Sequence, residues 1–393
     1  MEKCMLNEFS ITDYGAQADG TTLCTENIQQ AIDACHKAGG GKVLLPAGEW
    51  LSGTIELKSN VELYLSRGCR LLGSTDRRDY QDLVAPGLYD TDAPEKSTSC
   101  LIMAREADNI AVSGPGEING RGIAFYDTMG KNNKFEKPDK PRPRMLMAFR
   151  CRNIRLEDTH FIDAPCWTVW LMQSSDISVR GITVRGDERL RNNDGIDFDA
   201  CRHVTVSDSI FETEDDCLVL RNIQDLYQDR MPCEHITVSN CILKSNCQGI
   251  RIGCPSDGLI RNCVFTNCVI DSKNNGIVSN HPKIYSRSPE VTHEIYNILC
   301  SHMTITCPGT PIKIDIEQGI ELKKIRAFSF TDIFIESKKP CLILGSDKTE
   351  IEDITFNHVK IATSGEDSII CRNCRDVKLN SVTVSNIRPH TQE

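Results

Sequence analysis

The chain of 393 residues has no apolar run that approaches the roughly 18 residues of a membrane-spanning helix, so we expect no membrane partner. Its N-terminus, MEKCMLNEFSITDYG, lacks the basic start and apolar core of a secretory signal. We therefore expect a cytoplasmic protein, and leave export open for a trimmed chain.

The chain also lacks excess positive charge. Its net charge is -10, and nucleic acid needs a basic face, so nucleic acid is not an expected partner.

Cysteine is frequent but falls short of a disulfide scaffold, with 20 residues in the chain. Several cysteines stand beside short apolar segments: Cys151, Cys201, Cys233 and Cys241. Because cysteine packs well as a small buried side chain, we interpret them as reduced. Disulfides remain the alternative for an exported protein.

The hydrophobic content of 39% and the charged content of 25% are typical of a soluble globular protein.

One phrase recurs from residue 107 onward. Two polar residues precede an alternating apolar pair, as in DNIAVSG, RNIRLED, RHVTVSD and EDITFNH. The leading apolar residues are Ile154, Ile177, Val204, Ile236, Ile354 and Val377. Strict alternation indicates strands, and a strand every 20–30 residues without intervening helices indicates a solenoid. An antiparallel sandwich is the alternative, but it does not need the same phrase each time.

A second series of segments shares one register: GIDFD, CLVLR, GIRIG, GIVSN, PIKID and CLILG. Their second and fourth residues are mostly apolar and are predicted to point inward, so the intervening residues are predicted to face out. We therefore predict an all-β fold, a right-handed parallel β-helix, as a single domain over residues 1–393. An amphipathic helix over residues 25–36 is predicted to cap its first coil. The polar, proline-rich segment 121–145 is predicted to be a surface loop insertion.

Acidic motifs stand just before two members of the second series. Asp194 and Asp216 each lie two residues before an inward residue, Ile196 or Leu218, so they are predicted to stack about one coil apart, roughly 4.8 Å. Asp215 reaches the same patch if it lies at the bend before the strand. Three carboxylates this close do not all ionise readily, so one pKa is expected to rise. A protonated acid beside ionised bases is what glycosidic hydrolysis requires.

The alternative is that these acids are ordinary turn residues of a solenoid. We favour that interpretation for Asp197 and Asp199. For the three carboxylates in register on neighbouring coils, we favour a functional site.

An ordered set of motifs resembles the polygalacturonase-like glycoside hydrolases, which are pectin-degrading β-helix enzymes. The resemblance covers nearly the whole chain and includes DYGAQADGTT, TENIQQAIDAC, GPGEINGRG, RPRMLMAFRCRNIRLED and DAPCWTV. The family's Asn-x-Asp-Gly motif matches Asn192 to Gly195, and its Asp-Asp motif matches Asp215 and Asp216. The resemblance implies that Asp216 is the acid and that Asp194 and Asp215 activate water, with inversion. It also places Asn192 at the substrate.

The chain departs from the family where the substrate is bound. The family's Gly-His-Gly is Cys247-Gln248-Gly249 here, so an amide replaces the imidazole. Its Arg-Ile-Lys, which grips a uronate carboxylate, is Lys313-Ile314-Asp315. A histidine of some exo-acting members is replaced by Trp170. We expect Gln248, Lys313, Asp315 and Trp170 to line a changed substrate subsite.

Three other residues are candidate substrate ligands. Arg221 and Arg251 lie on the predicted outer face and could bind an anionic sugar, or else pair with Asp197 or Asp199. His281 follows the fourth outer strand and could reach the site, or be an ordinary loop histidine.

CRNC at 371–374 has metal-type spacing but no partner pair, so no metal and no cofactor are expected.

The resemblance implies an inverting glycoside hydrolase that acts on pectin-derived or related plant oligosaccharides. We expect exo action, because loops such as 130–144 could close one end of the cleft and favour release of single terminal sugars. Two alternatives stay open. A calcium-dependent lyase would need carboxylates around Ca²⁺ and a basic residue. A noncatalytic glycan-binding solenoid would explain the altered binding motifs but not the retained carboxylates. The oligomeric state is not predicted.

Overall fold

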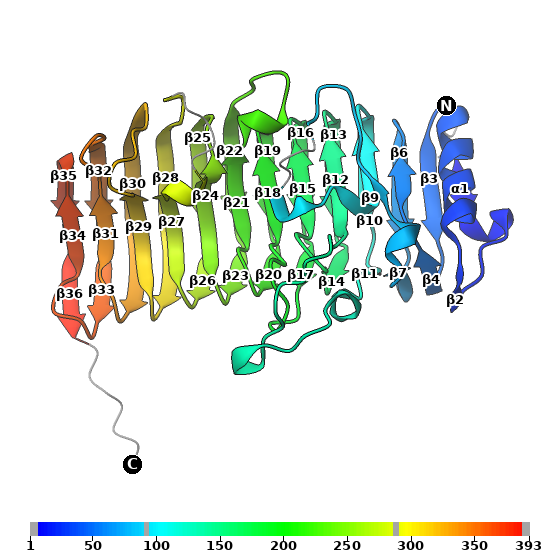
Figure 1. The fold of residues 1–393 in the computed structure, drawn as a ribbon, viewed down its shortest axis with the longest axis horizontal. Helices are drawn as coiled ribbons and strands as arrows, with labels where there is room; N and C mark the ends of the chain where they lie inside the picture. The colour runs from blue at the N-terminus through cyan, green and yellow to red at the C-terminus, as the bar shows by residue number, and fades with distance from the viewer. Residues whose placement is uncertain (1–6, 90–93, 286–290, 387–393) are drawn as a thin grey trace, which may run out of the picture. The chain divides into compact units, whose positions relative to one another are not determined.

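The computed structural model describes residues 7–89, 94–285 and 291–386 (Figure 1). The chain forms two compact units, and each is described by itself. Unit 1 comprises residues 1–197 and 201–210, and unit 2 comprises residues 198–200 and 211–393. The division falls within strands β18 (Ile196–Asp199) and β20 (Ile210–Thr213). The expectation of a single domain stays a prediction.

Unit 1 consists of three columns of parallel strands. The first column contains β1 (Glu8–Ser10), β3 (Gly41–Leu45), β6 (Val61–Leu65), β10 (Asp108–Ser113), β13 (Arg152–Glu157), β16 (Ser175–Arg180) and β19 (Arg202–Ser207). The second contains β2 (Asp19–Leu23), β4 (Gly48–Ser52), β7 (Cys69–Gly73), β11 (Glu117–Asn119), β14 (His160–Ile162) and β17 (Thr183–Arg185). The third contains β5 (Ile55–Leu57), β9 (Ser99–Arg105), β12 (Arg144–Phe149) and β15 (Val169–Met172), and β8 (Gln81–Asp82) pairs antiparallel with β9.

Unit 2 repeats the three columns. The first contains β22 (Cys233–Ser239), β25 (Leu259–Thr266), β28 (Glu294–Cys307), β30 (Lys324–Ser337), β32 (Ile351–Asn357) and β35 (Cys374–Asn380). The second contains β23 (Ile242–Ser245), β26 (Val269–Ser272), the later parts of β28 and β30, β33 (Lys360–Thr363) and β36 (Thr383–Asn386). The third contains β21 (Leu218–Asn222), β24 (Gln248–Ser256), β27 (Asn275–His281), β29 (Thr310–Ile316), β31 (Cys341–Leu344) and β34 (Ile369–Arg372).

The predicted right-handed parallel β-helix is confirmed. The predicted register also holds within each unit, because Ile154 pairs with Ile177, and Ile177 with Val204. In unit 2, Ile354 pairs with Val377. Short 3-10 helices lie in the connecting loops: η1 (Ile11–Tyr14), η2 (Arg77–Asp79), η3 (Pro94–Lys96), η4 (Gly122–Phe125), η5 (Lys131–Asn133), η6 (Gln224–Leu226) and η7 (Lys283–Tyr285). None of the helices in the described ranges has the length and apolar character needed to cross a bilayer.

The N-terminal helix is confirmed as α1 (Thr25–Lys37), drawn in dark blue in Figure 1. It buries the four residues that the spacing predicted: Ile28, Ala31, Ile32 and Cys35. These residues pack on the first strands of unit 1, so the helix covers apolar surface at the start of the stack.

Residues with a left-handed backbone recur at the bends where strands begin, and asparagine is frequent among them because it tolerates that conformation. Asn109 and Asn153 have φ of 56° and 57°. Their side chains form a ladder along unit 1, since Asn153 Nδ2 donates to Asn109 Oδ1 and Asn109 Nδ2 donates to Asn60 Oδ1, each at 2.8 Å. The ladder links equivalent positions of successive coils, at the starts of β6, β10 and β13.

The described cysteines are all free thiols, and nearly all are buried. Cys151, Cys201, Cys233 and Cys241 are each at most 2% exposed, which agrees with their interpretation as small apolar side chains. Cys371 is the exposed exception among the cysteines in the described ranges.

The insertion at 121–145 is anchored at its base within unit 1. Arg142 is 2% exposed and donates to the carbonyl of Arg191 (2.6 Å) and to Asn192 Oδ1 (3.0 Å). Phe125 and Tyr126 pack with Leu190 in a small apolar cluster. Both ends of the segment are thus fixed beside the motif that carries Asp194. Arg144 and Met145 at its end belong to the buried strand β12 rather than to a loop, and the rest of the predicted surface insertion stays a prediction.

The prediction that residues between the inward positions face solvent is wrong for the first strands of the second series. Asp197 and Asp199 are fully buried, and Arg221 is 2% exposed. Two of the three bond to the backbone: Asp199 Oδ1 accepts from the N–H of Ile223 (2.9 Å), and Arg221 donates to the carbonyl of Cys254 (2.6 Å). Hydrogen bonding to the backbone thus allows these polar side chains to be buried.

Candidate active site

Asp215 and Asp216 lie at the bend that leads into β21, as the site hypothesis required. Two hydroxyl groups hold this bend, because Thr213 Oγ1 (2.6 Å) and Ser245 Oγ (2.5 Å) both donate to the carbonyl of Asp215. Asp216 is fully buried, whereas Asp215 is partly exposed. The two neighbouring carboxyl groups therefore have different surroundings.

Asp216 forms an ion pair with an arginine one coil further along. Arg251 Nη1 lies 2.8 Å from Asp216 Oδ2, and the other oxygen, Oδ1, has no hydrogen-bond partner among the described residues. Burial alone lowers the pKa of Arg251, but the charge of Asp216 outweighs this and holds that pKa well above its ordinary value. Arg251 is therefore a permanent cation beside Asp216.

Asp215 is the carboxyl group whose pKa is raised. Burial, followed by the negative charge of Asp216, raises the pKa of Asp215 from 3.8 to about 6. The charge of Arg251 and a hydrogen bond from the Cys247 thiol oppose this rise. The expectation of one raised pKa in the cluster therefore holds at Asp215, while Asp216 is the carboxyl group that pairs with Arg251.

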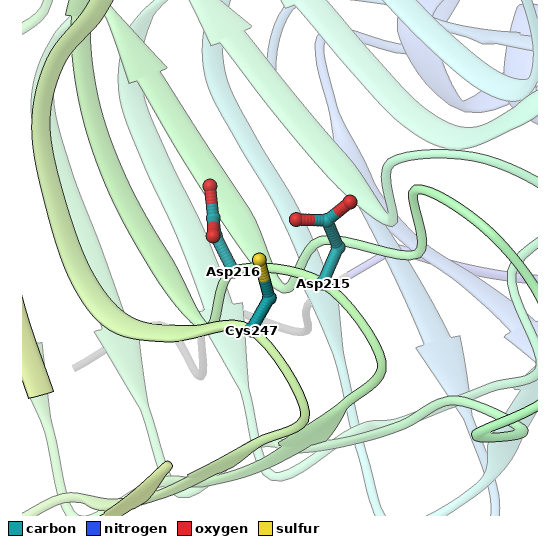
Figure 2. A group of neighbouring side chains, drawn as sticks. All are labelled: Asp215, Asp216 and Cys247. Atoms are coloured by element: carbon teal, nitrogen blue, oxygen red, sulfur yellow. The ribbon is translucent and has the colours of Figure 1, made fainter. Parts of the chain in front are cut away.

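Cys247 completes this cluster from the next coil (Figure 2). It stands in register with Asp215, because Leu218 of β21 pairs with Ile250 of β24. One ligand atom from each of Asp215, Asp216 and Cys247 lies within 4.8 Å of the others. Burial and the two carboxylates raise the pKa of the thiol. The three groups could hold a thiophilic divalent cation, but a thiol is a poor ligand for Ca²⁺, which takes oxygen.

Asp194 belongs to unit 1 and is 2% exposed. Its carbonyl accepts a hydrogen bond from the N–H of Thr168 (2.9 Å), which links its bend to the preceding coil. Asn192 accepts from Arg142, as described above. Because Asp215 and Asp216 belong to unit 2, the approach of Asp194 to them stays a prediction, as does substrate binding by Asn192.

Gln248, Lys313 and Asp315 replace the family's binding residues, and each contacts another side chain of unit 2. Asn275 Nδ2 donates to Gln248 Oε1 (2.5 Å), so this amide is tied to the next coil. Lys313 Nζ lies 2.9 Å from Asp315 Oδ2, and both side chains are partly exposed. The aspartate therefore neutralises the neighbouring lysine within the same strand, β29.

Three predicted substrate ligands have little exposed surface. Trp170 is 1% exposed, and the guanidinium of Arg144 lies 4.6 Å from its ring centre, which favours packing over sugar stacking. His281 is 6% exposed; burial, then the nearby His293, lowers its pKa well below the ordinary value. Arg221 is 2% exposed, as described above. Substrate binding by these three residues stays a prediction.

Sequence reasoning missed two features of the site. Arg251 was expected to bind sugar or to pair with Asp197 or Asp199, but it pairs with Asp216. Cys247 was noted only as part of an altered motif. The shared register of CLVLR and GIRIG contained the signal, because it places residue 247 one coil from residue 215.

A sequence profile described as Glycosyl hydrolases family 28 matches residues 35–386. The chain belongs to this family. It is 23% identical to an endo-polygalacturonase of Pectobacterium carotovorum subsp. carotovorum over 363 residues, covering 88% of this chain and 86% of that protein. It is 29% identical to a probable polygalacturonase of Vitis vinifera, but this match covers 57% of the chain and only 46% of the grape protein.

The fold of this family 28 chain is similar to that of an exopolygalacturonase from Thermotoga maritima. The TM-score is 0.79 at 21% identity, covering 96% of this chain and 92% of the other. As a family 28 member the chain is a glycoside hydrolase, and the Asp215–Asp216 pair is its candidate proton-transfer machinery in unit 2.

Proposed function

We propose that this glycoside hydrolase cleaves pectin-derived oligosaccharides, and that the Asp215–Asp216 pair carries the proton transfer. The observation that supports the proposal is one carboxyl group with a pKa near 6 beside one that is paired with a cation. With a pKa of about 6, Asp215 keeps its proton in mildly acidic solution, and a protonated carboxyl group is what protonation of a leaving oxygen requires. The names of the curated relatives support a pectic substrate.

Within the pair, the geometry favours Asp215 as the proton donor. Asp215 is the partly exposed member and has the raised pKa, whereas Asp216 is fully buried and paired with Arg251. Asp194 would then accept the proton of the attacking water, and Asp216 would help to orient that water. This proposal reverses the roles that the family resemblance implied for Asp215 and Asp216.

Inversion depends on the third carboxylate. Asp215 and Asp216 have oxygens within 4.8 Å of each other, closer than the roughly 6.5–9.5 Å that leaves room for water in an inverting enzyme. We therefore assign the water-activating role in inversion mainly to Asp194. Proton NMR of the first product formed tests this directly, because the opposite anomer to the substrate is expected, and retention would contradict the proposal.

We also propose that terminal sugars are released. The support is the insertion at 121–145, which Arg142 ties to Asn192, next to Asp194 in unit 1. Curated relatives carry both endo-polygalacturonase and exopolygalacturonase names, so they do not decide the matter. Product sizes from a defined octasaccharide test it: monosaccharide alone at early times is expected, and a ladder of intermediate sizes would contradict exo action.

The lyase alternative is disfavoured by the same geometry. Arg251 would have to act as the base, but the pKa of Arg251 is held well above its ordinary value by Asp216. The cluster also contains a thiol, which suits Ca²⁺ poorly. Insensitivity to a chelator is therefore expected.

The buried free thiols suit a reducing compartment, so cytoplasmic location is kept as a proposal.

A further inference from the structure

A cavity of about 380 Å³ in unit 2 is lined by three lysines. Lys273 lies in the turn before β27, Lys313 on β29, and Lys339 in the turn before β31. Neutral groups complete the wall, including Asn274, Asn275 and Thr310, and none of the described residues lining the cavity is acidic. We call this cavity the lysine pocket. The net charge of the chain is -10, yet every charged side chain that lines this pocket is a cation. The pocket is therefore selective for anions.

The lysine pocket lies along the same column of bends as the candidate proton donor. Gln248, which follows Cys247, pairs with Asn275, and Asn275 pairs with Thr310. Side chains also link these bends, since Asn274 Nδ2 lies 3.7 Å from Cys247 Sγ. The pocket wall thus begins about two coils from Asp215, roughly 10 Å at the spacing of parallel strands. A sugar bound there would neighbour the bond being cleaved.

The lysines of the pocket differ in how far their charge is already neutralised. Lys313 pairs with Asp315 at 2.9 Å. Lys273 and Lys339 are exposed, and neither has a carboxylate within 4.0 Å among the described residues. Lys273 and Lys339 are therefore the two lysines whose full charge is open to a ligand. An ammonium group binds a carboxylate as a point charge, without requiring the fork geometry that arginine supplies.

We propose that Lys273 and Lys339 bind the carboxylate of a uronate residue next to the cleaved bond. This inference rests on the proposed function, because it names the charged part of a substrate cleaved by the same site. It also explains how the chain can hold a pectic substrate although Asp315 neutralises Lys313. The carboxylate would be bound by lysines in the turns before β27 and β31, the two strands that pair with β29, rather than by residues of β29 itself.

The test measures binding rather than turnover. Calorimetry uses the Asp215→Asn variant, which keeps the shape and neutrality of a protonated Asp215, with two ligands: trigalacturonate and its fully methyl-esterified form. The Lys273→Gln/Lys339→Gln double substitution is expected to weaken trigalacturonate binding on the order of tenfold, since two exposed charge contacts with the ligand are lost. Binding of the neutral ester is expected to stay the same.

Matched control variants distinguish a local charge contact in the pocket from a loss of structure or of net positive charge. Lys378→Gln removes an exposed lysine of β35 that lies outside the pocket, and it is expected to change neither affinity. Lys273→Arg/Lys339→Arg is expected to retain trigalacturonate binding, which a general loss of structure would not allow. Inorganic phosphate is expected to compete only weakly, because it lacks the sugar contacts.

Four results would overturn the inference. They are equal weakening for acid and ester, no weakening for either, phosphate binding as tight as that of trigalacturonate, and absence of trigalacturonate binding by the unsubstituted pocket. A failure of the proposed function looks different: the wild-type protein would then hydrolyse no pectic oligosaccharide, whatever the lysines bind.

Discussion

Arg251 Nη1 and Asp216 Oδ2 lie 2.8 Å apart, and this ion pair sets the charge of the candidate site. Asp216 is fully buried, and the Arg251 side chain is 17% exposed. Arg251 also lowers the pKa of Asp215, so one arginine pairs with one carboxyl group and opposes the pKa rise of the other. Its removal should therefore affect both stability and pH dependence.

Arg251→Gln is expected to lower the free energy of unfolding by about 3–5 kcal/mol, because it leaves Asp216 as an uncompensated buried charge. It should also move the alkaline limit of activity to higher pH, since a cation that lowers the pKa of Asp215 is lost. Urea unfolding and a pH–rate profile measure the two effects. Arg375→Gln breaks an exposed pair with Glu352 and serves as the control, expected to lose less than about 1 kcal/mol. Equal losses for the two variants would contradict this account.

Asp215 makes the stability of the protein depend on pH in a defined direction. Its pKa is about 6 in the folded protein and near 3.8 when unfolded, so the folded state retains a proton that the unfolded state has lost. This contribution to stability is complete below about pH 4 and is lost as pH rises through about 6. Asp215→Asn should therefore raise the melting temperature by about 2 °C or more at pH 7, and have little effect at pH 4. Asp367→Asn, at an exposed site, should show no such pH dependence.

Leaving-group dependence distinguishes the roles of the two aspartates. Asp215→Asn should reduce kcat by at least ~10²-fold on natural linkages, the usual scale for loss of a general acid. On an aryl glycoside with a good leaving group the loss should be much smaller, because the departing oxygen needs no proton. Asp216→Asn should reduce kcat on both substrates. The opposite pattern would restore the roles that the family resemblance implied.

Cys247 should make the enzyme sensitive to thiophilic cations. Cd²⁺ is expected to inhibit by bridging the thiolate and the two carboxylates, whose donor atoms lie within 4.8 Å of one another. Binding releases the thiol proton, so inhibition should strengthen as pH rises. Ultraviolet absorption of the cadmium–thiolate bond measures binding without activity. Cys247→Ala should abolish this band, whereas Cys371→Ala, at an exposed cysteine, should leave it unchanged. A persistent band in Cys247→Ala would place the metal elsewhere.

Asp315 should limit activity on plain polygalacturonate. Its carboxylate neutralises Lys313 and repels a uronate, and each lost charge-assisted hydrogen bond is worth about 1–3 kcal/mol. Asp315→Lys should therefore raise kcat/KM for polygalacturonate by at least tenfold, with no gain on oligosaccharides ending in rhamnose, galactose or arabinose. Wild-type hydrolysis of polygalacturonate as efficient as that of its best substrate would contradict this prediction.

The coil register could be predicted from sequence because each strand repeats the same local pattern. Ile154, Ile177 and Val204 pair as the phrase indicated, since a shift of one residue would expose an apolar side chain. The carboxyl pair could be found in the same way, from Leu218. The predictions were thus correct for the apolar side chains, whose inward direction the period-2 pattern determines.

The contacts of polar side chains could not be predicted in this way. Alternation predicted that Asp197 and Arg221 face outward, but it does not reveal what covers that face. Arg251 could reach several carboxylates, and only the three-dimensional structure selects Asp216. Lys273 and Lys339 lie in turns, where no periodic pattern assigns a direction.

The asparagine ladder bears on how such a chain changes length during evolution. The side chains of Asn60, Asn109 and Asn153 hydrogen-bond to the equivalent asparagine of an adjoining coil, so each of these bonds depends on the alignment of one neighbouring coil. A duplicated coil that keeps its asparagine would rejoin the ladder on both sides, and distant coils would not need to adjust. Gain or loss of whole coils should therefore be tolerated more readily than a single-residue insertion within a strand, which would break one rung and reverse every side chain beyond it.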